Sequence, residues 1–446
     1  MIGATAVRYT FKLLSTATLL ITLGTASAAP EIKRWTTAAG TPVLFVKSPE
    51  IAMIDVRVLF AAGSARDGGA GGVANLVNGL LKEGAGDLDS NGFNAAMADT
   101  GARLSVGARR DTADISIRTL SDPKYADPAL ALAALALSKP RFDGPAIDRL
   151  KSRAQNALKR VEQSPGALAD REYYRMIYGD HPYGNPPSGD LESVSQISKQ
   201  DIESFYKRYY VAANAHVLIV GGIDQSRAEK LAEQMLAELP KGAAAPPIPA
   251  VADLEEAVSQ HLSFPSIQSH LRMGAPGLKR GDPDYFPLLV GNHVLGGSAL
   301  VSLLFKEIRE KRGLSYGARS GFVPMQDRGP FLASLQTDGS QLAEATRVMN
   351  ETIAAFIENG PSDDELAQAK KNLIDGFPLR INSNSKLADY IGVIGFYDLP
   401  LDYLETFSGK VAAVTKEQVV DAFKRRLNPS VFATISVGGD APSARP

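Results

Sequence analysis

Two stretches of the chain repeat each other without a gap at an offset of 217 residues. Residues 198–222 read SKQDIESFYKRYYVAANAHVLIVGG, and residues 415–439 read TKEQVVDAFKRRLNPSVFATISVGG. Each begins with Ser or Thr, followed three positions later by Asp or Gln, which is typical of a capping box at a helix N-terminus. Each helical part then leads into a β-rich run that is closed by Gly-Gly. The repeat predicts that the same helix-and-strand unit occurs twice.

A second pair of matching segments lies upstream, at an offset of 216 residues. Residues 144–158 (GPAIDRLKSRAQNAL) and 360–374 (GPSDDELAQAKKNLI) both open with Gly-Pro and continue as helices. The two matches indicate a duplicated unit of about 200 residues, a normal domain size. Between the copies, residues 239–253 (LPKGAAAPPIPAVAD) have the Pro and Ala content of a semi-extended linker. We therefore expect an N-terminal domain over 29–238 and a C-terminal domain over 254–446.

The hydrophobic pattern within each half mixes strands and helices. Residues 51–64 and 102–120 have strand character, whereas residues 127–137 and 342–360 have helical character. Because the strands come in adjacent runs and do not strictly alternate with helices, an α+β fold is favoured over a doubly wound sheet. The prediction is two homologous α/β sandwich domains.

The first 28 residues have the pattern of a secretory signal peptide. Arg8 and Lys12 form a basic region, an apolar run covers Leu13–Leu23, and Ala26-Ser27-Ala28 is a cleavage site of the A-x-A type. The apolar run is shorter than the roughly 20 residues that span a bilayer. The chain has no cysteine, which excludes disulfides, and its formal net charge is −1, so no bulk attraction to nucleic acid or anionic lipid is evident. We expect cleavage after residue 28 and export to the periplasm of a Gram-negative bacterium, with no membrane attachment thereafter.

Three local strings carry a family resemblance. Residues 71–86 (GGVANLVNGLLKEGAG) predict a helix by their apolar spacing, residues 179–189 read GDHPYGNPPSG, and residues 295–322 read LGGSALVSLLFKEIREKRGLSYGARSGF. Together with the duplicated unit, these strings resemble the insulinase–pitrilysin family of zinc peptidases, which includes the mitochondrial processing peptidase. The resemblance covers nearly the whole mature chain and implies a bowl-shaped molecule built from two homologous domains.

The zinc motif of that family is degenerate in this chain. Catalytic members carry HxxEH on the first helix, where two histidines one turn apart bind zinc and the glutamate acts as general base. The alignment of GVANLVNG places the two histidine positions at Asn75 and Gly79 and the base position at Asn78. The family's further glutamate ligand falls near Gln155-Asn156, where no acidic residue stands. Neutral amides and glycine do not make a zinc site, so we expect no metal in this chain and no peptidase activity of the chain alone.

The resemblance also assigns a role to Arg312 and Tyr316. In the family, an arginine and a tyrosine of the non-zinc domain reach toward the zinc domain and hold the substrate and its polarised carbonyl. A guanidinium and a phenol donate hydrogen bonds without first being deprotonated, which suits a developing oxyanion. Without the resemblance, Arg312 reads as a solvated cation at a helix end and Tyr316 as an ordinary strand residue.

Two functions follow as hypotheses. The first is a non-catalytic subunit of a periplasmic heterodimeric zinc metallopeptidase that degrades peptides and unfolded polypeptides. The zinc lies in a homologous HxxEH-bearing partner, and Arg312 and Tyr316 complete the partner's active site in trans. The alternative is a catalytically inert peptide-binding or scaffold protein of the same fold. A peptidase of unrelated mechanism, with Ser298, Ser302 or Ser315 as nucleophile, receives the least support.

Overall fold

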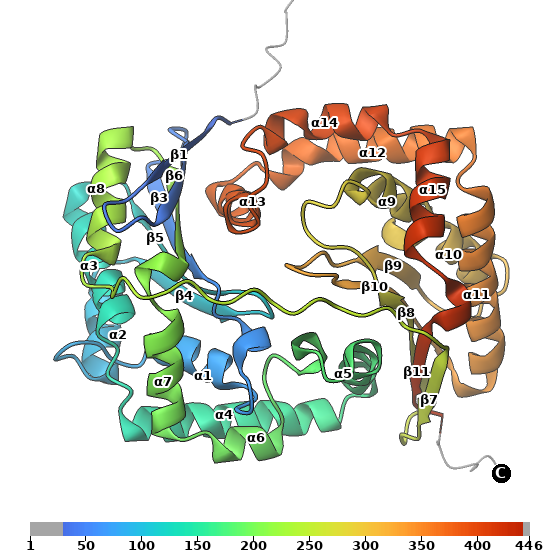
Figure 1. The fold of residues 1–446 in the computed structure, drawn as a ribbon, viewed down its shortest axis with the longest axis horizontal. Helices are drawn as coiled ribbons and strands as arrows, with labels where there is room; N and C mark the ends of the chain where they lie inside the picture. The colour runs from blue at the N-terminus through green and yellow to red at the C-terminus, as the bar shows by residue number, and fades with distance from the viewer. Residues whose placement is uncertain (1–29, 440–446) are drawn as a thin grey trace, which may run out of the picture.

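A computed structural model describes residues 30–439, so the predicted signal peptide lies outside the described residues. The described part contains one β-sheet in each half of the chain (Figure 1). The strands of the first sheet, which has the order β1-β2-β6-β3-β5-β4, are β1 (Ile32–Thr36), β2 (Pro42–Lys47), β3 (Met53–Phe60), β4 (Arg103–Ala108), β5 (Ala113–Leu120) and β6 (Ala215–Gly221). Those of the second sheet, in the order β7-β11-β8-β10-β9, are β7 (Val258–Leu262), β8 (Gln268–Pro276), β9 (Ala318–Phe322), β10 (Pro330–Asp338) and β11 (Ala433–Val437).

The two sheets have the same topology once β1 is set aside. The pairing of β2 with β6 is parallel, and so is the pairing of β7 with β11. The remaining neighbours are antiparallel in both sheets, from β6 through β3 and β5 to β4, and from β11 through β8 and β10 to β9. The predicted two-domain α+β fold is therefore confirmed.

The helices repeat in the same way. The first half contains α1 (Val73–Leu80), α2 (Ser90–Asp99), α3 (Pro123–Ser138), α4 (Gly144–Glu162), α5 (Pro165–Tyr178), α6 (Leu191–Gln196), α7 (Lys199–Tyr209) and α8 (Gln225–Leu236). The second contains α9 (Tyr285–Asn292), α10 (Leu303–Phe305), α11 (Leu342–Asn359), α12 (Asp363–Arg380), α13 (Asn384–Phe396), α14 (Tyr403–Ala413) and α15 (Lys416–Arg426). Both α7 and α15 begin at the predicted capping boxes, with Ser198 and Thr415 as N-caps. No helix within residues 30–439 has the length and apolar character to cross a membrane.

The helix predicted over residues 71–86 is shorter in the structure. α1 ends at Leu80, and turns follow it. Gly84 and Gly86 have φ angles of 122° and 55°, which lie in the region that glycine adopts without strain and that an α-helix does not use. The predicted helix was too long at its C-terminal end, because the apolar spacing alone does not show that the backbone turns after Leu80.

The two halves exchange a helix. α5, from the first half, packs on β8 and β11 of the second sheet, and α13, from the second half, packs on β6 and β3 of the first sheet (Figure 1). Asp170 of α5 pairs with Arg272 of β8 at 2.5 Å, and a Cβ at Gly395 of α13 would lie only 2.9 Å from Cδ1 of Leu44. Neither half therefore closes its own core, and we expect the two halves to fold and unfold together.

The segment between the halves, residues 239–253, crosses the molecule without helix or strand (Figure 1). It is anchored along its length. Arg66 donates to the carbonyl of Pro246 at 2.8 Å, and the Val251 amide donates to Asp327 Oδ1 at 3.0 Å. His181 contacts the Pro249 carbonyl through Nε2 at 3.0 Å. The segment is therefore fixed against both halves.

Candidate functional site

Helix α1, which carries the degenerate zinc-motif positions, packs its apolar face against the core of the first half. Asn75 is exposed, and its Nδ2 lies 3.5 Å from Ser188 Oγ. Asn78 is 2% exposed, and its Nδ2 donates to the Asp114 carbonyl at 3.0 Å and to Tyr210 Oη at 3.2 Å. The Asn78 amide, at the general-base position, therefore links α1 to β5 and to the residue that follows α7.

Gly79 stands where α1 touches α4. A Cβ at Gly79 would lie 2.9 Å from Cδ2 of Leu150, so any larger residue requires Leu150 to move. Within residues 30–439, no group of three or more His, Asp or Glu side chains is placed to hold a metal ion. The donors at these positions are amides and a glycine, which lack the charge and the electron pairs that zinc requires. The α1 residues therefore do not fit a zinc ion.

Asp67 holds the N-terminus of α1 in place. Gly72, the N-cap residue, has no side chain, and Asp67 accepts hydrogen bonds from the amides of Gly72 at 2.7 Å and Ala74 at 2.9 Å. Burial raises the pKa of Asp67 to about 7, although the two amide donors act in the opposite direction. This carboxyl group caps the helix from the preceding turn and so fixes the start of α1.

Arg312 and Tyr316 lie at the surface of the second half, between a π-helical turn (Lys306–Glu310) and β9. Arg312 Nη1 donates to the carbonyl and to Oε2 of Glu307 at 2.8 and 2.7 Å. Tyr316 is 84% exposed, and its ring lies under the guanidinium of Arg309, 4.3 Å from the ring centroid. Within the described residues, neither side chain forms a hydrogen bond, ion pair or ring contact with α1.

Ser315, between these two residues, lies in the string GLSYG, which matches the GxSxG pattern of serine hydrolases. Ser315 is 7% exposed, and its hydroxyl contacts the carbonyls of Gln336 at 2.6 Å and Gly317 at 2.9 Å. A nucleophilic serine needs an exposed Oγ and a base within hydrogen-bond reach. Among the described residues, the hydroxyl of Ser315 contacts backbone groups and no basic side chain, so its environment is that of a structural serine.

A cavity of about 530 Å³ lies between the two halves, and no pattern in the sequence predicts it. It is lined by β3, the β4–β5 turn, α5, the β9–β10 connection and α13. Its charged lining residues are Arg57, Arg109, Arg110, Asp111, Arg280 and Asp389. The only trace of it in the sequence is the charged run Arg109-Arg110-Asp111, which interrupts an otherwise alternating strand segment.

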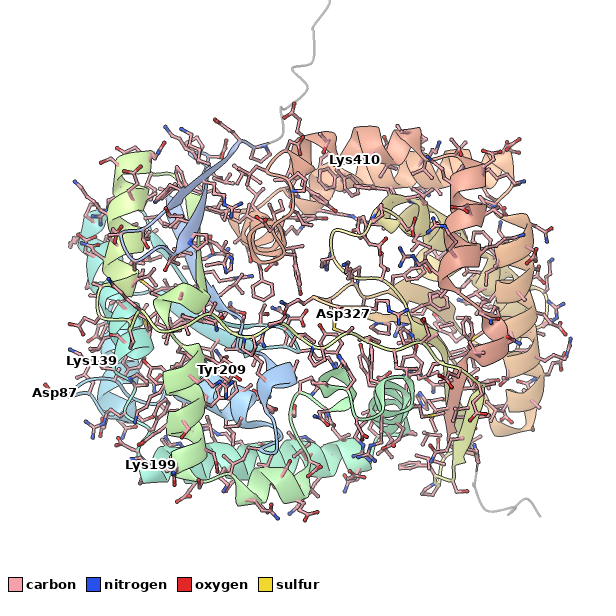
Figure 2. All side chains as sticks on the ribbon, viewed as in Figure 1. Asp87, Lys139, Lys199, Tyr209, Asp327 and Lys410 are labelled. Atoms are coloured by element: carbon pink, nitrogen blue, oxygen red, sulfur yellow. The ribbon has the colours of Figure 1, made fainter. Side chains whose placement is uncertain are left out.

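Asp111 joins the two halves at this cavity. It is 4% exposed and accepts hydrogen bonds from Tyr183 Oη at 2.6 Å, Tyr397 Oη at 2.8 Å and the Gln326 amide at 2.8 Å. Tyr183 Oη also accepts from the amide of Asp327, which Figure 2 places at the centre of the molecule, where the linker crosses. One carboxylate of the first half thus holds a helix and a turn of the second half.

Comparison with known proteins matches both halves to one family. Residues 42–190 match the model described as "Insulinase (Peptidase family M16)", and residues 196–373 match "Peptidase M16 inactive domain". The "Non-peptidase homolog YmxG" of Helicobacter pylori is 26% identical over 407 residues, covering 89% of this chain and 92% of that protein. The "Uncharacterized zinc protease YmxG" of Bacillus subtilis is 22% identical over 361 residues, covering 80% and 86%.

Solved structures agree with this match. The crystal structure of a peptidase M16 inactive domain from Pseudomonas fluorescens has a TM-score of 0.88 and 38% identity, and the match covers 91% of this chain and 98% of that one. A protease from Helicobacter pylori has a TM-score of 0.82 at 19% identity, with 92% and 99% covered, which shows the shared fold. The chain belongs to the insulinase family, peptidase family M16.

Proposed function

We propose that this chain is the non-catalytic subunit of a heterodimeric zinc metallopeptidase of the periplasm. It pairs with a homologous subunit that carries an intact HxxEH motif, and it contributes Arg312 and Tyr316 to that subunit's active site. The observation that carries the proposal is the contrast between its two halves. The general-base position of the zinc motif holds Asn78, a buried structural donor, whereas Tyr316 is 84% exposed and outside the chain's own core.

The exposure of Tyr316 is unusual for a large aromatic residue. A single exposed apolar residue is common, but a group of neighbouring exposed apolar residues indicates a contact surface. Leu300 and Val301, in the same glycine-rich signature string, are 66% and 53% exposed. We infer that this string faces a partner, and the relative named a non-peptidase homologue supports a chain of this kind without its own catalysis.

The chemistry assigned to this chain is limited to binding and orientation. The partner's zinc supplies the activated water for peptide hydrolysis. Arg312 donates to the substrate backbone, and the Tyr316 hydroxyl donates to the carbonyl oxygen as it acquires negative charge. The substrate adds as a strand to a sheet edge of the catalytic subunit, so the main chain is bound with little sequence preference.

The test is peptide hydrolysis by the mixed pair, with an unstructured fluorogenic peptide as substrate and the homologous HxxEH-bearing chain as partner. Loss of one oxyanion donor commonly lowers kcat by about 10²–10³, so Tyr316→Phe and Arg312→Ala should each reduce turnover strongly while the heterodimer still elutes intact from size exclusion. Lys311→Ala is the matched control, because Lys311 is a neighbouring exposed cation that also pairs with Glu307. Unchanged turnover in the Arg312 and Tyr316 variants overturns their role, and a mixed pair that cleaves nothing favours the inert peptide-binding or scaffold protein.

A further inference from the structure

The cavity between the two halves is lined by more arginine side chains than carboxylates. Arg57 pairs with Asp389 at 2.8 Å and lies 3.8 Å from Asp114, which is itself 3.7 Å from Arg109. These contacts account for two of the four guanidinium groups that line the cavity. The side chains of Arg109 and Asp389 are 70% and 59% exposed, so solvent reaches the cavity.

The other two guanidinium groups have no carboxylate partner among the described residues. The guanidinium carbon of Arg110 lies over the ring of Tyr174, 3.6 Å from its centroid, and its Nε donates to the Tyr183 carbonyl at 2.9 Å. These two contacts hold its orientation and leave its terminal nitrogens without hydrogen bonds. Burial lowers the pKa of this guanidinium, the expected response of a cation without a paired anion.

Arg280 lines the same cavity. Its guanidinium lies 5.6 Å from the centroid of the Tyr397 ring, and its Nε is buried without a hydrogen-bond partner. Asp111, one of the two carboxylates in the cavity lining, already accepts from two tyrosine hydroxyls and one amide. Asp389, the other carboxylate in the lining, pairs with Arg57. A bound anion that contacts the terminal nitrogens of Arg280 would therefore form an ion pair that no described carboxylate supplies.

We propose that this cavity is a binding site for a carboxylate of a peptide, held by Arg110 and Arg280. A guanidinium presents a planar fork that matches two carboxylate oxygens. The cavity volume of about 530 Å³ is within the range of small-ligand sites and suits a short peptide segment. Its apolar lining, including Leu59, Val393 and Phe396, favours a carboxylate on a partly apolar chain over a fully hydrated polyanion.

The choice of a peptide as the ligand rests on the proposed function, whereas the choice of a carboxylate rests on the guanidinium groups. The carboxylate has two possible sources in a peptide, an acidic side chain or the C-terminus. In the heterodimer, this site would retain acidic peptides, or peptides with a free C-terminus, inside the non-catalytic subunit. Because binding requires no partner and no metal, it is measured on this chain alone.

The experiment is calorimetric titration of the purified full chain with three matched peptides. They are Ac-Ala-Ala-Glu-Ala-Ala-amide, the same peptide with Gln in place of Glu, and the Gln peptide with a free C-terminal carboxylate. We expect at least one carboxylate peptide to bind about tenfold or more tightly than the neutral Gln amide, with binding that weakens as salt is raised. Which carboxylate peptide binds identifies the source.

Two variants and one control locate the site. Arg280→Met and Arg110→Met keep an unbranched, partly apolar side chain and remove the guanidinium fork, and each should weaken carboxylate binding about tenfold. Arg347→Met is the control, because Arg347 lies on α11 and pairs only with Glu351, outside the cavity. Equal affinity for all three peptides, or carboxylate binding that survives both cavity substitutions, overturns the proposal. These results are independent of hydrolysis by the mixed pair, so failure of one proposal is distinguishable from failure of the other.

Discussion

Substitution of Asp111 tests whether one buried carboxylate fixes the arrangement of the two halves. In the folded chain it accepts hydrogen bonds at 2.6, 2.8 and 2.8 Å, two of them from tyrosine hydroxyls. Asp111→Ala leaves three donors without their acceptor, and loss of one member of a buried charged network costs about 3–5 kcal/mol. Asp111→Asn retains one acceptor oxygen for the Gln326 amide and Tyr397, so we expect a smaller loss of about 1–2 kcal/mol.

The assay is urea unfolding followed by far-UV circular dichroism. Because α5 and α13 are exchanged between the halves, we expect one transition, with the free energy of unfolding lowered in the order wild type, Asp111→Asn, Asp111→Ala. A double-mutant cycle with Tyr397→Phe should give a coupling energy of about 1 kcal/mol or more. An Asp111→Ala protein within about 0.5 kcal/mol of the wild type, or additive effects in the cycle, would refute the reasoning.

Three further predictions concern the first half. Asn78→Ala leaves the Tyr210 hydroxyl unpaired in the core and should lower the free energy of unfolding by about 2–3 kcal/mol in the same urea assay, and Tyr210→Phe should reduce that penalty. Gly79→His should destabilise the chain because its Cβ meets Leu150, and a lower thermal midpoint without zinc uptake checks this. Burial lowers the pKa of His216 to about 4 from its ordinary 6.5, so the unfolded chain binds a proton first as the pH falls. The contribution of neutral His216 to the free energy of unfolding, on the order of 3 kcal/mol, is therefore lost as the pH falls from 6.5 to 4. His216→Gln should abolish this part of the pH dependence, which is measured by unfolding at several pH values.

The duplicated architecture could be predicted because its signals are local. The capping boxes at Ser198 and Thr415 depend on residues three positions apart, and both form in the structure. The apolar stripes of α5 and α13 show which face is buried, but nothing in them specifies which sheet covers that face. The exchange of these helices depends on packing between segments far apart in sequence, and the hydrophobic pattern does not contain it.

The same distinction between local signals and long-range contacts applies to the candidate sites. The residue types at Asn75, Asn78 and Gly79 are enough to predict that this helix binds no zinc. The hydrogen bonds of buried Asn78 could not be predicted, because its partner Tyr210 lies 132 positions away in the sequence. The cavity was missed for the same reason, since Asp111 and Tyr397 are separated by 286 positions. The assignment of Arg312 and Tyr316 came from resemblance and stays a prediction.

The most direct test of the central claim is zinc analysis of the separated chains after co-purification of the complex from its native host. We predict that a homologous HxxEH-bearing chain co-purifies with this one, that zinc remains with that partner, and that this chain alone holds no zinc and cleaves no peptide. Stoichiometric, tightly bound zinc in the isolated chain, together with peptide hydrolysis, would contradict the account.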